Sequence, residues 1–392
     1  MHSAERDYGI DSSLHVACES SAPVPVSHAN PILWHAARFG DRQLWRLQRS
    51  PRDTWRSPAL FGCVTAEWIN SYPCDVVNLH WITNGFLSVE TVGRITKPIV
   101  WTMYDMWPFT GTEHYAPDGP RARWIQGYSA ANRPLDESGL DLDRWSFERK
   151  ERHWSMLRDS TTMVPASTWL ESTVRQSALM GGWRVERIPH VVDTSIFKPA
   201  DRQQARNSIG LPLLPDSKTV LFLSSGGITD PRKGWDLLEQ ACTAPAIREL
   251  SLTIIIVGPR PSEEDAQRIG LRVGHNLIWF GHVTSSADLC ALYCSADVVA
   301  VPSRQDNMPL TAMEAQSCNI PVAGFAIGGL PDIVGDGETG ALSPDVSADG
   351  LAEALTICLS RDFGSAPRER ALRTWAPDIV TERYRRLYAS LL

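Results

Sequence analysis

The strongest indication of the fold comes from VVAVPSRQDNMPLTAMEAQSCNIPVAGFAIGGLPDIV, residues 298–334. It opens with a continuous apolar, β-branched run, which is typical of a strand buried on both faces of a parallel sheet. Pro309 suits the first turn of a helix, so Asp306 and Asn307 should precede that helix and Glu314 should lie inside it. Free NH groups at a helix start favour an anion such as a diphosphate, and carboxylates beside them accept hydrogen bonds from sugar hydroxyls.

Short apolar runs alternate with amphipathic stretches on both sides of this segment. After residue 200 we predict strands at 219–224, 252–257, 277–281, 297–302 and 321–325, with helices at 235–241, 263–269 and 287–293. Before residue 200 we predict strands at 76–79, 99–103 and 161–164. Repeated βα units predict an α/β fold with two Rossmann-like domains, each built on a doubly wound parallel sheet, that face one another across a cleft.

The segment IPHVVDTSIFKPADRQQ, residues 188–204, interrupts both periodicities and is interpreted as the linker between the domains. We therefore expect an N-terminal domain over residues 1–195 and a C-terminal domain over residues 196–376. The final segment, residues 377–392, is expected to form a helix that crosses back to the N-terminal domain. A length of 392 residues is consistent with two domains that each bury a core.

Composition excludes several classes of protein. A net charge of -7 argues against a nucleic-acid binder, because affinity for a phosphate backbone is carried by clustered Lys and Arg. The start, MHSAERDYGIDSS, has no apolar signal region, and no run of about 18 apolar residues occurs, so we predict a cytoplasmic protein without a membrane span. Of the 15 Trp residues, 12 precede residue 184. The two halves of the chain are therefore expected to differ in the side chains that they bury or use for contacts.

No metal or cofactor site is predicted. Cys290 and Cys294 lie four apart in ADLCALYCSAD and are interpreted as small side chains on one helix face. The D-x-D at residues 141–143 matches a metal motif only by its letters. The G-x-G-x-x-G at residues 335–340 precedes apolar residues instead of opening a helix, so it is interpreted as a turn and not as a dinucleotide site.

Several segments, taken in order, resemble the family 4 retaining glycosyltransferases, which have the GT-B fold. An acid, seven residues and a Glu, followed by PV-x-G-F-x-I-GG-x-PD, is similar to the donor-site signature of that family. Further similar segments are VVNLHWITNGFLS (76–88), KPIVWTMYDMWPFTGTEHY (97–115) and SSGGITDPRKGWDLL (224–238). The likeness runs from about Gly9 to the C-terminus, and its first-domain segments are most similar to bacterial exopolysaccharide and colanic-acid-type enzymes.

The turn after the first strand of the second domain is SSGGITDPRKG, at the carboxyl end of a parallel strand where ligands bind. Gly226 and Gly227 allow close approach of the backbone to a donor. Family members place basic residues here against the leaving diphosphate. The resemblance therefore implies that Arg232 and Lys233 act in catalysis by stabilising charge on the departing nucleotide.

The resemblance also gives roles to residues around the predicted helix start. Glu314 corresponds to the glutamate that accepts hydrogen bonds from the ribose hydroxyls. Asp306 corresponds to the catalytic acid that meets the transferred sugar, with Asp in place of the commoner Glu. Gly328 and Gly329 are expected to form a tight turn beside the donor. Backbone NH groups directed to the phosphates or the sugar are implied for Asn307, Met308 and Leu310.

Three polar residues end predicted strands of the first domain and should open onto the cleft. His80 ends one strand and is a candidate catalytic residue, although a His at a strand end is as often a structural one. Tyr104 and Asp105 end the next strand, and Tyr104 stands where the family often has His. His114 is expected in a loop near the cleft.

A basic and aromatic segment, RWSFERKERHWSML, begins at Arg144 and ends at Leu157. An amphipathic helix of this kind can lie at an anionic membrane surface, which would suit a lipid-linked acceptor. The alternative is an ordinary helix with a solvated face. Peripheral contact with the inner face of the plasma membrane is therefore one expectation for this otherwise cytoplasmic chain.

These features together predict a retaining glycosyltransferase that moves a hexose from a nucleotide diphosphate sugar to a glycan or lipid-linked saccharide, without a metal, in surface polysaccharide biosynthesis. A second interpretation is a non-catalytic or truncated remnant, because the family opens with a strand and a Gly-rich turn that we do not find before GIDSSLHVACES. A third interpretation is a nucleotide-sugar epimerase with the same fold.

Overall fold

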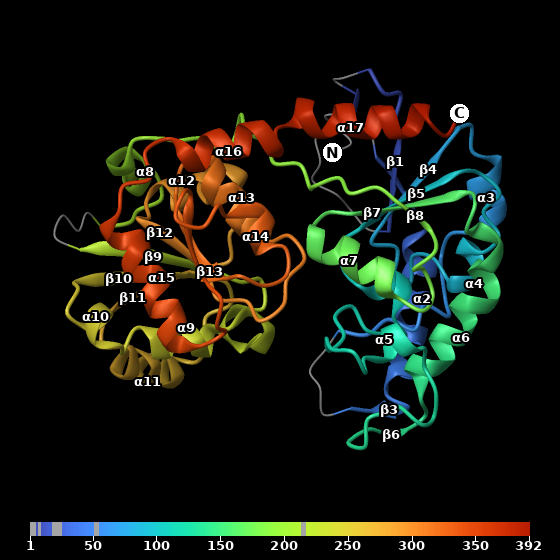
Figure 1. Cartoon of the computed structure of the whole chain (residues 1–392), viewed down its shortest axis with the longest axis horizontal. Coiled ribbons are helices and arrows are strands. Elements are labelled where there is room, and N and C mark those ends of the chain that lie inside the picture. The colour runs from blue at the N-terminus through green and yellow to red at the C-terminus, as the bar shows by residue number, and fades with distance from the viewer. Residues whose placement is uncertain (1–4, 7–8, 18–25, 51–54, 213–216) are drawn as a thin grey trace. The chain divides into compact units, whose positions relative to one another are not determined.

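The computed structural model describes residues 5–6, 9–17, 26–50, 55–212 and 217–392 (Figure 1). The chain divides into two compact units. The N-terminal unit comprises Met1–Ile188 with Thr381–Leu392, and the C-terminal unit comprises Pro189–Val380. The division after Ile188 lies at the start of the segment that the sequence indicates as a linker.

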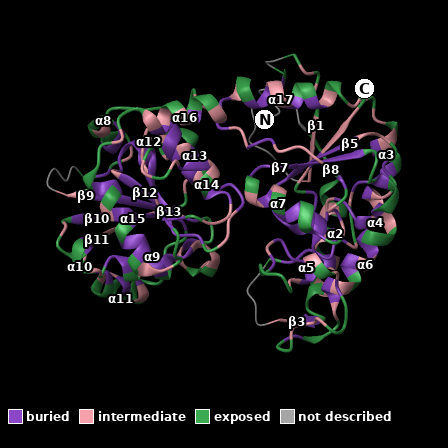
Figure 2. Ribbon diagram, viewed as in Figure 1, coloured by how far each residue is buried: buried purple, intermediate pink, exposed green. Residues whose placement is uncertain are grey.

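The C-terminal unit is built on a six-stranded, all-parallel sheet in the order β11-β10-β9-β12-β13-β14. Its strands are β9 (Lys218–Leu223), β10 (Leu252–Val257), β11 (Asn276–Gly281), β12 (Val298–Val301), β13 (Val322–Phe325) and β14 (Gly340–Ser343). The central strands are buried along almost their whole length (Figure 2), because helices cover the apolar, β-branched runs that form them. The five strands predicted after residue 200 correspond to β9 through β13.

The helices of this unit lie between its strands as in repeated βα units, before β9 or after β14. They are α8 (Arg202–Ser208), α9 (Trp235–Ala241), α10 (Pro245–Arg248), α11 (Glu263–Val273), α12 (Ser286–Cys294), α13 (Leu310–Ser317), α14 (Leu330–Ile333), α15 (Ala348–Ser360) and α16 (Ala366–Thr374). Serine hydroxyls at Ser262, Ser285 and Ser347 cap the starts of α11, α12 and α15 by accepting backbone NH hydrogen bonds. Two short 3-10 turns, η3 (Gly227–Thr229) and η4 (Pro231–Lys233), lie between β9 and α9.

The strand order contains a topological switch. From β9 the chain proceeds outward to β10 and β11 on one side, and from β12 it proceeds to β13 and β14 on the other. At this point the carboxyl ends of β9 and β12 lie side by side, and the space outside them is where open α/β sheets bind ligands. We therefore expect a ligand site at residues 224–234 and 302–309, which follow β9 and β12.

The N-terminal unit contains a four-stranded parallel sheet in the order β4-β5-β7-β8. Its strands are β4 (Val77–His80), β5 (Ile99–Met103), β7 (Thr161–Pro165) and β8 (Arg184–Val185). Two small sheets accompany it: β1 (Leu14–Val16) with β2 (Val26–His28), and β3 (Gln48–Arg49) with β6 (Ser138–Gly139). The three strands predicted before residue 200 correspond to β4, β5 and β7.

The helices of the N-terminal unit are α2 (Pro31–Trp45), α3 (Ala66–Ser71), α4 (Val89–Val92), α5 (Arg123–Gln126), α6 (Leu142–Trp154) and α7 (Thr168–Gln176), with 3-10 turns η1 (Trp107–Phe109) and η2 (Ser155–Leu157). Much of the tryptophan concentrated in this half is in the core. The rings of Trp101 and Trp107 lie 5.1 and 5.9 Å from the ring of Trp154, which is fully buried. Core packing therefore accounts for part of the excess of tryptophan in this half of the chain.

The basic and aromatic residues of α6 are largely internal. Lys150 is fully buried, and its Nζ donates to the backbone carbonyls of Trp107, Thr110 and Gly111. Arg149 is also buried and pairs with Glu90 at 2.6 Å. Packing therefore explains much of the pattern from which membrane contact was inferred. On α6 itself, the basic or aromatic residues that keep exposed surface for such contact are Arg144, Trp145, Arg152 and His153.

The last helix, α17 (Pro377–Ala389), contributes its C-terminal part to the N-terminal unit. The hydroxyl of Tyr384 lies 3.0 Å from Thr102 Oγ1, and the hydroxyl of Tyr388 accepts a hydrogen bond from Asn78 at 2.7 Å. Among the residues that the structure describes, none of the helices is both long enough and apolar enough to cross a bilayer.

Candidate functional site

The loops that follow β9 and β12 are tied to each other. Arg304 NH donates to the carbonyl of Arg232 at 2.8 Å, and the Arg304 side chain donates to the carbonyl of Pro231 at 2.8 Å. Gly234 has a φ of +71°, and a Cβ at this position would overlap the carbonyl oxygen of Pro302. Only glycine, which tolerates this left-handed backbone and has no Cβ, allows the two loops to approach so closely.

Three sequence-predicted catalytic residues meet at this switch point. Lys233 Nζ lies 2.6 Å from Asp306 Oδ2, and Arg232 Nη1 lies 3.5 Å from the same oxygen. Arg232 also donates to the carbonyl of Gln305 at 3.1 Å. All three side chains are partly buried, which strengthens their interactions relative to fully exposed charges. Two cations and one carboxylate therefore share a small volume at the carboxyl ends of β9 and β12.

The turn after β13 supports the backbone of Asp306. Gly329 NH donates to the carbonyl of Asp306 at 3.0 Å. Gly328 has a φ of +56°, and a Cβ there would overlap the same carbonyl oxygen. The predicted tight turn at these two glycines is present, and it lies directly against the predicted sugar-contacting acid.

Glu314 lies in the second turn of α13, and its carboxylate accepts a hydrogen bond from the hydroxyl of Tyr293 at 2.7 Å. Burial raises the pKa of Glu314 to about 7, and the hydrogen bond from Tyr293 opposes that rise. The carboxyl group therefore changes its charge near neutral pH. Sequence reasoning did not identify Tyr293, because its hydroxyl comes from α12 and nothing in the local pattern of that helix marks a polar partner.

The residues at the start of α13 differ in exposure. Asn307 and Met308 are buried, whereas Leu310, the first helical residue, is 47% exposed. Pro309 immediately precedes the helix as its N-cap, with a ψ of 114°, so it does not lie in the first helical turn as expected. An extended proline at this point allows the loop from β12 to enter the helix without losing an NH group from its first turn.

His190 is a further residue near this site that sequence reasoning did not select. Burial lowers its pKa to about 4, and the negative charge of Asp306 partly opposes that shift. The imidazole is therefore neutral at pH 7 and lies close enough to Asp306 to sense its charge. A single His in an irregular segment gives no signal in the sequence.

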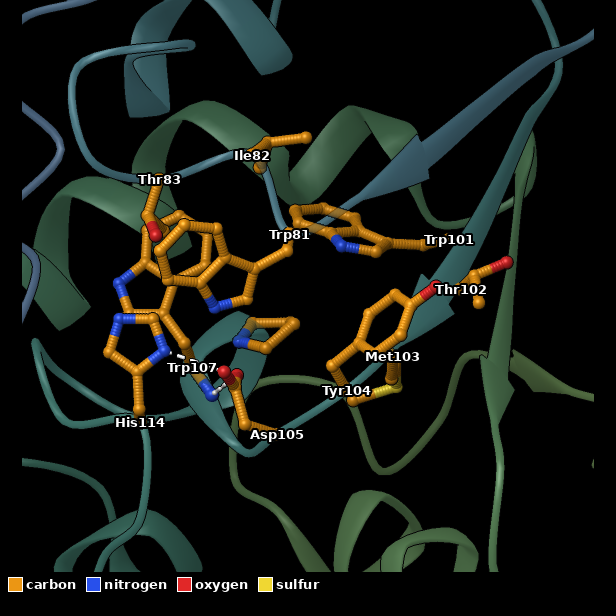
Figure 3. A pocket seen from close by; sticks show the side chains of 11 residues that line it. Trp81, Ile82, Thr83, Trp101, Thr102, Met103, Tyr104, Asp105, Trp107 and His114 are labelled. Atoms are coloured by element: carbon orange, nitrogen blue, oxygen red, sulfur yellow. Dashed lines mark hydrogen bonds and ion pairs between the residues drawn. The ribbon is translucent and has the colours of Figure 1, made fainter. Parts of the chain in front are cut away.

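The N-terminal unit has a small, open pocket at the carboxyl ends of β4 and β5 (Figure 3). Its lining comes from the two strand ends and the loops that follow them: Trp81, Ile82, Thr83, Trp101, Thr102, Met103, Tyr104, Asp105, Trp107, Pro108 and His114. His80 Nδ1 lies 3.1 Å from the hydroxyl of Tyr104. The candidates that the sequence placed at neighbouring strand ends therefore contact each other.

His114 is held by hydrogen bonds on both sides of its ring. Its Nδ1 lies 2.6 Å from Asp105 Oδ2, and its Nε2 lies 2.8 Å from Ser57 Oγ. Because Asp105 accepts the Nδ1 proton, Nε2 is left to accept from the hydroxyl of Ser57. Ser57 is only 4% exposed, so this relay orients the imidazole and does not present a serine to substrate. Ser57 was not predicted, since it is distant in sequence from both partners.

Two tryptophans are exposed beside this relay. Trp55 and Trp81 are 55% and 42% exposed, and their ring centroids lie 6.1 Å apart in an edge-to-face arrangement. The imidazole of His114 packs 5.7 Å from the ring of Trp81 (Figure 3). Trp81 has a φ of +40°, a left-handed conformation that is unusual for a bulky residue and is found where surrounding structure enforces it.

Comparison with known protein families covers the C-terminal unit. Residues 217–361 match the family described as Glycosyl transferases group 1, and this range contains the loops after β9 and β12. The D-inositol 3-phosphate glycosyltransferases of Mycobacterium tuberculosis (strain ATCC 25618 / H37Rv) and Mycobacterium bovis (strain BCG / Pasteur 1173P2) are each 35% identical over 223 residues. These matches cover 52% of this chain and 44% of each relative, so the chain spans less than half the length of these curated relatives.

Solved structures share the fold of the chain at low sequence identity. Sucrose-phosphate synthase from Thermosynechococcus elongatus has a TM-score of 0.65 and 18% identity, and the likeness covers 100% of this chain and 91% of that one. HepE from Anabaena, in complex with UDP and glucose, has a TM-score of 0.58 and 16% identity over 83% of this chain and 80% of that one. The predicted GT-B fold is confirmed. The predicted resemblance is supported at the level of the group 1 glycosyltransferases, and the closer likeness to family 4 and to colanic-acid-type enzymes stays a prediction.

Proposed function

We propose that this chain is a retaining glycosyltransferase that moves a hexose from a nucleotide diphosphate sugar to a glycan or lipid-linked saccharide in surface polysaccharide biosynthesis. The observation that carries the proposal is the meeting of Arg232, Lys233 and Asp306 at the switch point between β9 and β12. Cations at this position suit a diphosphate, and a carboxylate beside them suits the hydroxyls of a sugar.

Each part of the proposed donor is assigned to its own group of residues. The diphosphate would lie against Arg232, Lys233 and the start of α13, where backbone NH groups and the helix dipole favour negative charge. The transferred sugar would contact Asp306, and the ribose hydroxyls would donate to Glu314. Because HepE, which shares the fold, has been solved with UDP and with UDP-glucose, a uridine nucleotide is the first donor to test.

The proposed reaction breaks the bond between the anomeric carbon and the leaving phosphate oxygen, and forms a bond from that carbon to the acceptor oxygen on the same face. The acceptor hydroxyl gives its proton to the leaving phosphate. Lys233 and Arg232 stabilise the charge that grows on the diphosphate, and removal of one such donor typically costs about 3 kcal/mol of transition-state stabilisation. No protein nucleophile takes part; orientation and charge stabilisation supply the rate.

The exposed aromatic rings of the N-terminal unit support a saccharide as acceptor. A pyranose has an apolar face of C–H groups that packs on an indole ring, and large aromatic side chains give much contact area for little loss of conformational freedom. Trp55 and Trp81 offer two such rings within 6.1 Å of each other. The curated relatives are named for an inositol phosphate acceptor, so a polyol phosphate is the second acceptor class to test.

The direct test is to incubate the chain with UDP-hexoses and a panel of saccharide and inositol phosphate acceptors, and to measure UDP release and the anomeric configuration of the product. Lys233→Ala should abolish most of the release. Lys218→Ala is the matched control, because Lys218 lies at the opposite, amino end of β9. Release that is unchanged in Lys233→Ala would refute the proposed site.

Two other results would support the alternatives. Conversion of one UDP-hexose into another in the absence of acceptor would identify an epimerase. Binding of the donor without release or transfer, with every acceptor tried, would identify a non-catalytic relative. Inversion at the anomeric carbon would contradict the retaining mechanism while leaving the donor site in place.

A further inference from the structure

Three cysteines of the C-terminal unit converge on one point. Cys290 and Cys294 lie one turn apart on α12, and Cys318 ends α13 as its C-cap. The three sulfur atoms all lie within 4.8 Å of one another, and the Sγ atoms of Cys290 and Cys318 are 3.8 Å apart. The sequence showed only the pair on one helix; the packing of α12 against α13 adds the third thiol.

A backbone oxygen faces the same point. The carbonyl of Lys198 accepts hydrogen bonds from the thiols of Cys290 at 3.5 Å and Cys294 at 3.4 Å. The neighbouring carbonyl of Phe197 is fixed by hydrogen bonds from Ser317 Oγ at 2.6 Å and from the Arg368 side chain at 2.7 Å. The segment that supplies the oxygen is therefore held in place beside the sulfur atoms.

We propose that these three thiols, with the Lys198 carbonyl or a water as a fourth ligand, form a binding site for a thiophilic divalent cation such as Zn²⁺. Zn–S bonds of about 2.3 Å in a tetrahedron place the sulfur atoms roughly 3.8 Å apart, which is the separation of Cys290 and Cys318. The other two separations are at most 4.8 Å, so they exceed the tetrahedral value by about 1 Å or less. The site differs from the expectation of no metal drawn from the sequence.

Hydrophobic packing alone explains only part of the arrangement of the three cysteines. A buried cysteine often behaves as a small apolar side chain, which accounts for one thiol or a pair on one helix face. It does not account for three thiols from two helices converging with a shared carbonyl oxygen. Cys294 and Cys318 are buried, while Cys290 is only partly buried and leaves a path for an ion to enter.

A cation bound at this site would also hold two helices together. Tyr293, which lies between Cys290 and Cys294 on α12, donates to Glu314, one turn before Cys318 on α13. A cation held by all three cysteines would clamp α12 to α13 beside this hydrogen bond. The inference rests on the cysteine geometry alone and stands whether or not the chain transfers sugars.

The test uses the full chain, reduced and freed of metal, and titrates it with Co²⁺, which reports its own coordination by absorption. We expect one equivalent to bind, with the intense d–d bands of a tetrahedral site and thiolate-to-cobalt charge transfer, and Zn²⁺ to displace it. Cys290→Ser and Cys318→Ser should each weaken binding by more than about 100-fold, beyond the range seen for changes in outer-shell partners. Cys242→Ala, which removes a buried thiol elsewhere in the same unit, should bind as the unchanged chain does.

Circular dichroism and thermal melting show whether each variant is folded. A loss of Co²⁺ binding is then not mistaken for a loss of the fold. Cys290 is the least buried of the three, so Cys290→Ser disturbs packing least and carries the comparison. The proposal is overturned if the folded, reduced chain binds no equivalent of Co²⁺, or if Cys290→Ser binds with unchanged affinity and spectrum. It is also overturned if Co²⁺ does not bind and mild oxidation instead joins Cys290 to Cys318, which would make the cluster a redox pair.

Discussion

Donor affinity should depend on pH through Glu314. Burial raises the pKa of this carboxyl group to about 7. If the ionised form accepts hydrogen bonds from the ribose, the fraction of protein able to bind rises with pH. A carboxyl group with a pKa near 7 is ionised in roughly one molecule in eleven at pH 6 and in roughly ten in eleven at pH 8, so the apparent affinity should rise about tenfold over this range.

Isothermal titration calorimetry with UDP-glucose at pH 6, 7 and 8 measures this rise. The diphosphate of a nucleotide sugar has no proton that titrates in this range, and the pKa of His190, about 4, keeps that side chain neutral throughout. Glu314→Gln keeps the shape of the side chain without its charge and should bind weakly, with a nearly flat profile. Tyr293→Phe removes a hydrogen bond that lowers the pKa of Glu314, so it should move the rise to higher pH.

The same shift predicts the pH dependence of stability. The folded pKa of Glu314, about 7, exceeds its ordinary value of 4.5, so the native state binds this proton more tightly than the unfolded chain. The contribution of Glu314 to unfolding free energy should therefore fall as the pH rises from about 4.5 through 7, and Glu314→Gln should remove that component. Identical binding and stability profiles for the unchanged chain and Glu314→Gln would refute the reasoning.

Three further substitutions test other parts of the account. Lys233→Ala should lower the transfer rate by about 100-fold or more with little change in the melting temperature, measured by steady-state kinetics and thermal melting; an unaltered rate would contradict its role. Lys150→Met should destabilise the N-terminal unit by about 1–3 kcal/mol in urea unfolding, because buried carbonyl oxygens lose their hydrogen-bond donor, and an unchanged midpoint would argue against this. Gly234→Ala should both lower stability by at least about 1 kcal/mol and weaken nucleotide binding, since its Cβ would force the two site loops apart; retention of full affinity would show that their close approach is dispensable.

The parallel strands were readable from the sequence because of how they are buried. Runs such as LTIIIV in β10 are apolar throughout, as a strand covered on both faces must be, and the predicted bounds of this strand equal the observed ones. The strand β14, GALS, was not predicted. It is short, begins with a glycine and lies at the edge of the sheet, so it lacks the apolar run that marks a central strand.

The candidate donor residues were found because strand order determines where loops meet. Asp306 and Lys233 each follow a predicted strand, and the carboxyl ends of neighbouring parallel strands share one edge. Their 2.6 Å contact could not be predicted, since it depends on glycine-permitted loop packing between segments 73 residues apart. Side-chain convergence across helices, as for Cys318, leaves no local pattern for the same reason.

The pattern of α6 could not be interpreted correctly from the sequence. A lysine in a basic, aromatic helix is ordinarily a solvated residue, yet Lys150 extends into the core and satisfies carbonyl oxygens of the loop after β5. Only the three-dimensional placement of that loop shows that its carbonyl oxygens take a side-chain nitrogen as their donor. Charge patterning therefore predicted a helix correctly but not the side of it that faces solvent.

Thermal unfolding of the chain with UDP, GDP, dTDP and ADP and their common sugars, alongside Glu314→Ala and Lys233→Ala, shows directly whether a nucleotide sugar binds between β9 and β12. A ligand at a hundred times its dissociation constant should stabilise the folded state by about 2.7 kcal/mol. We expect stabilisation by one nucleotide series, reduced in both variants and retained in Lys218→Ala. Two results would contradict the assignment of a donor site between β9 and β12. One is a cooperatively folded chain whose melting temperature responds to none of these nucleotides. The other is a stabilisation that is as large in both variants as in the unchanged chain.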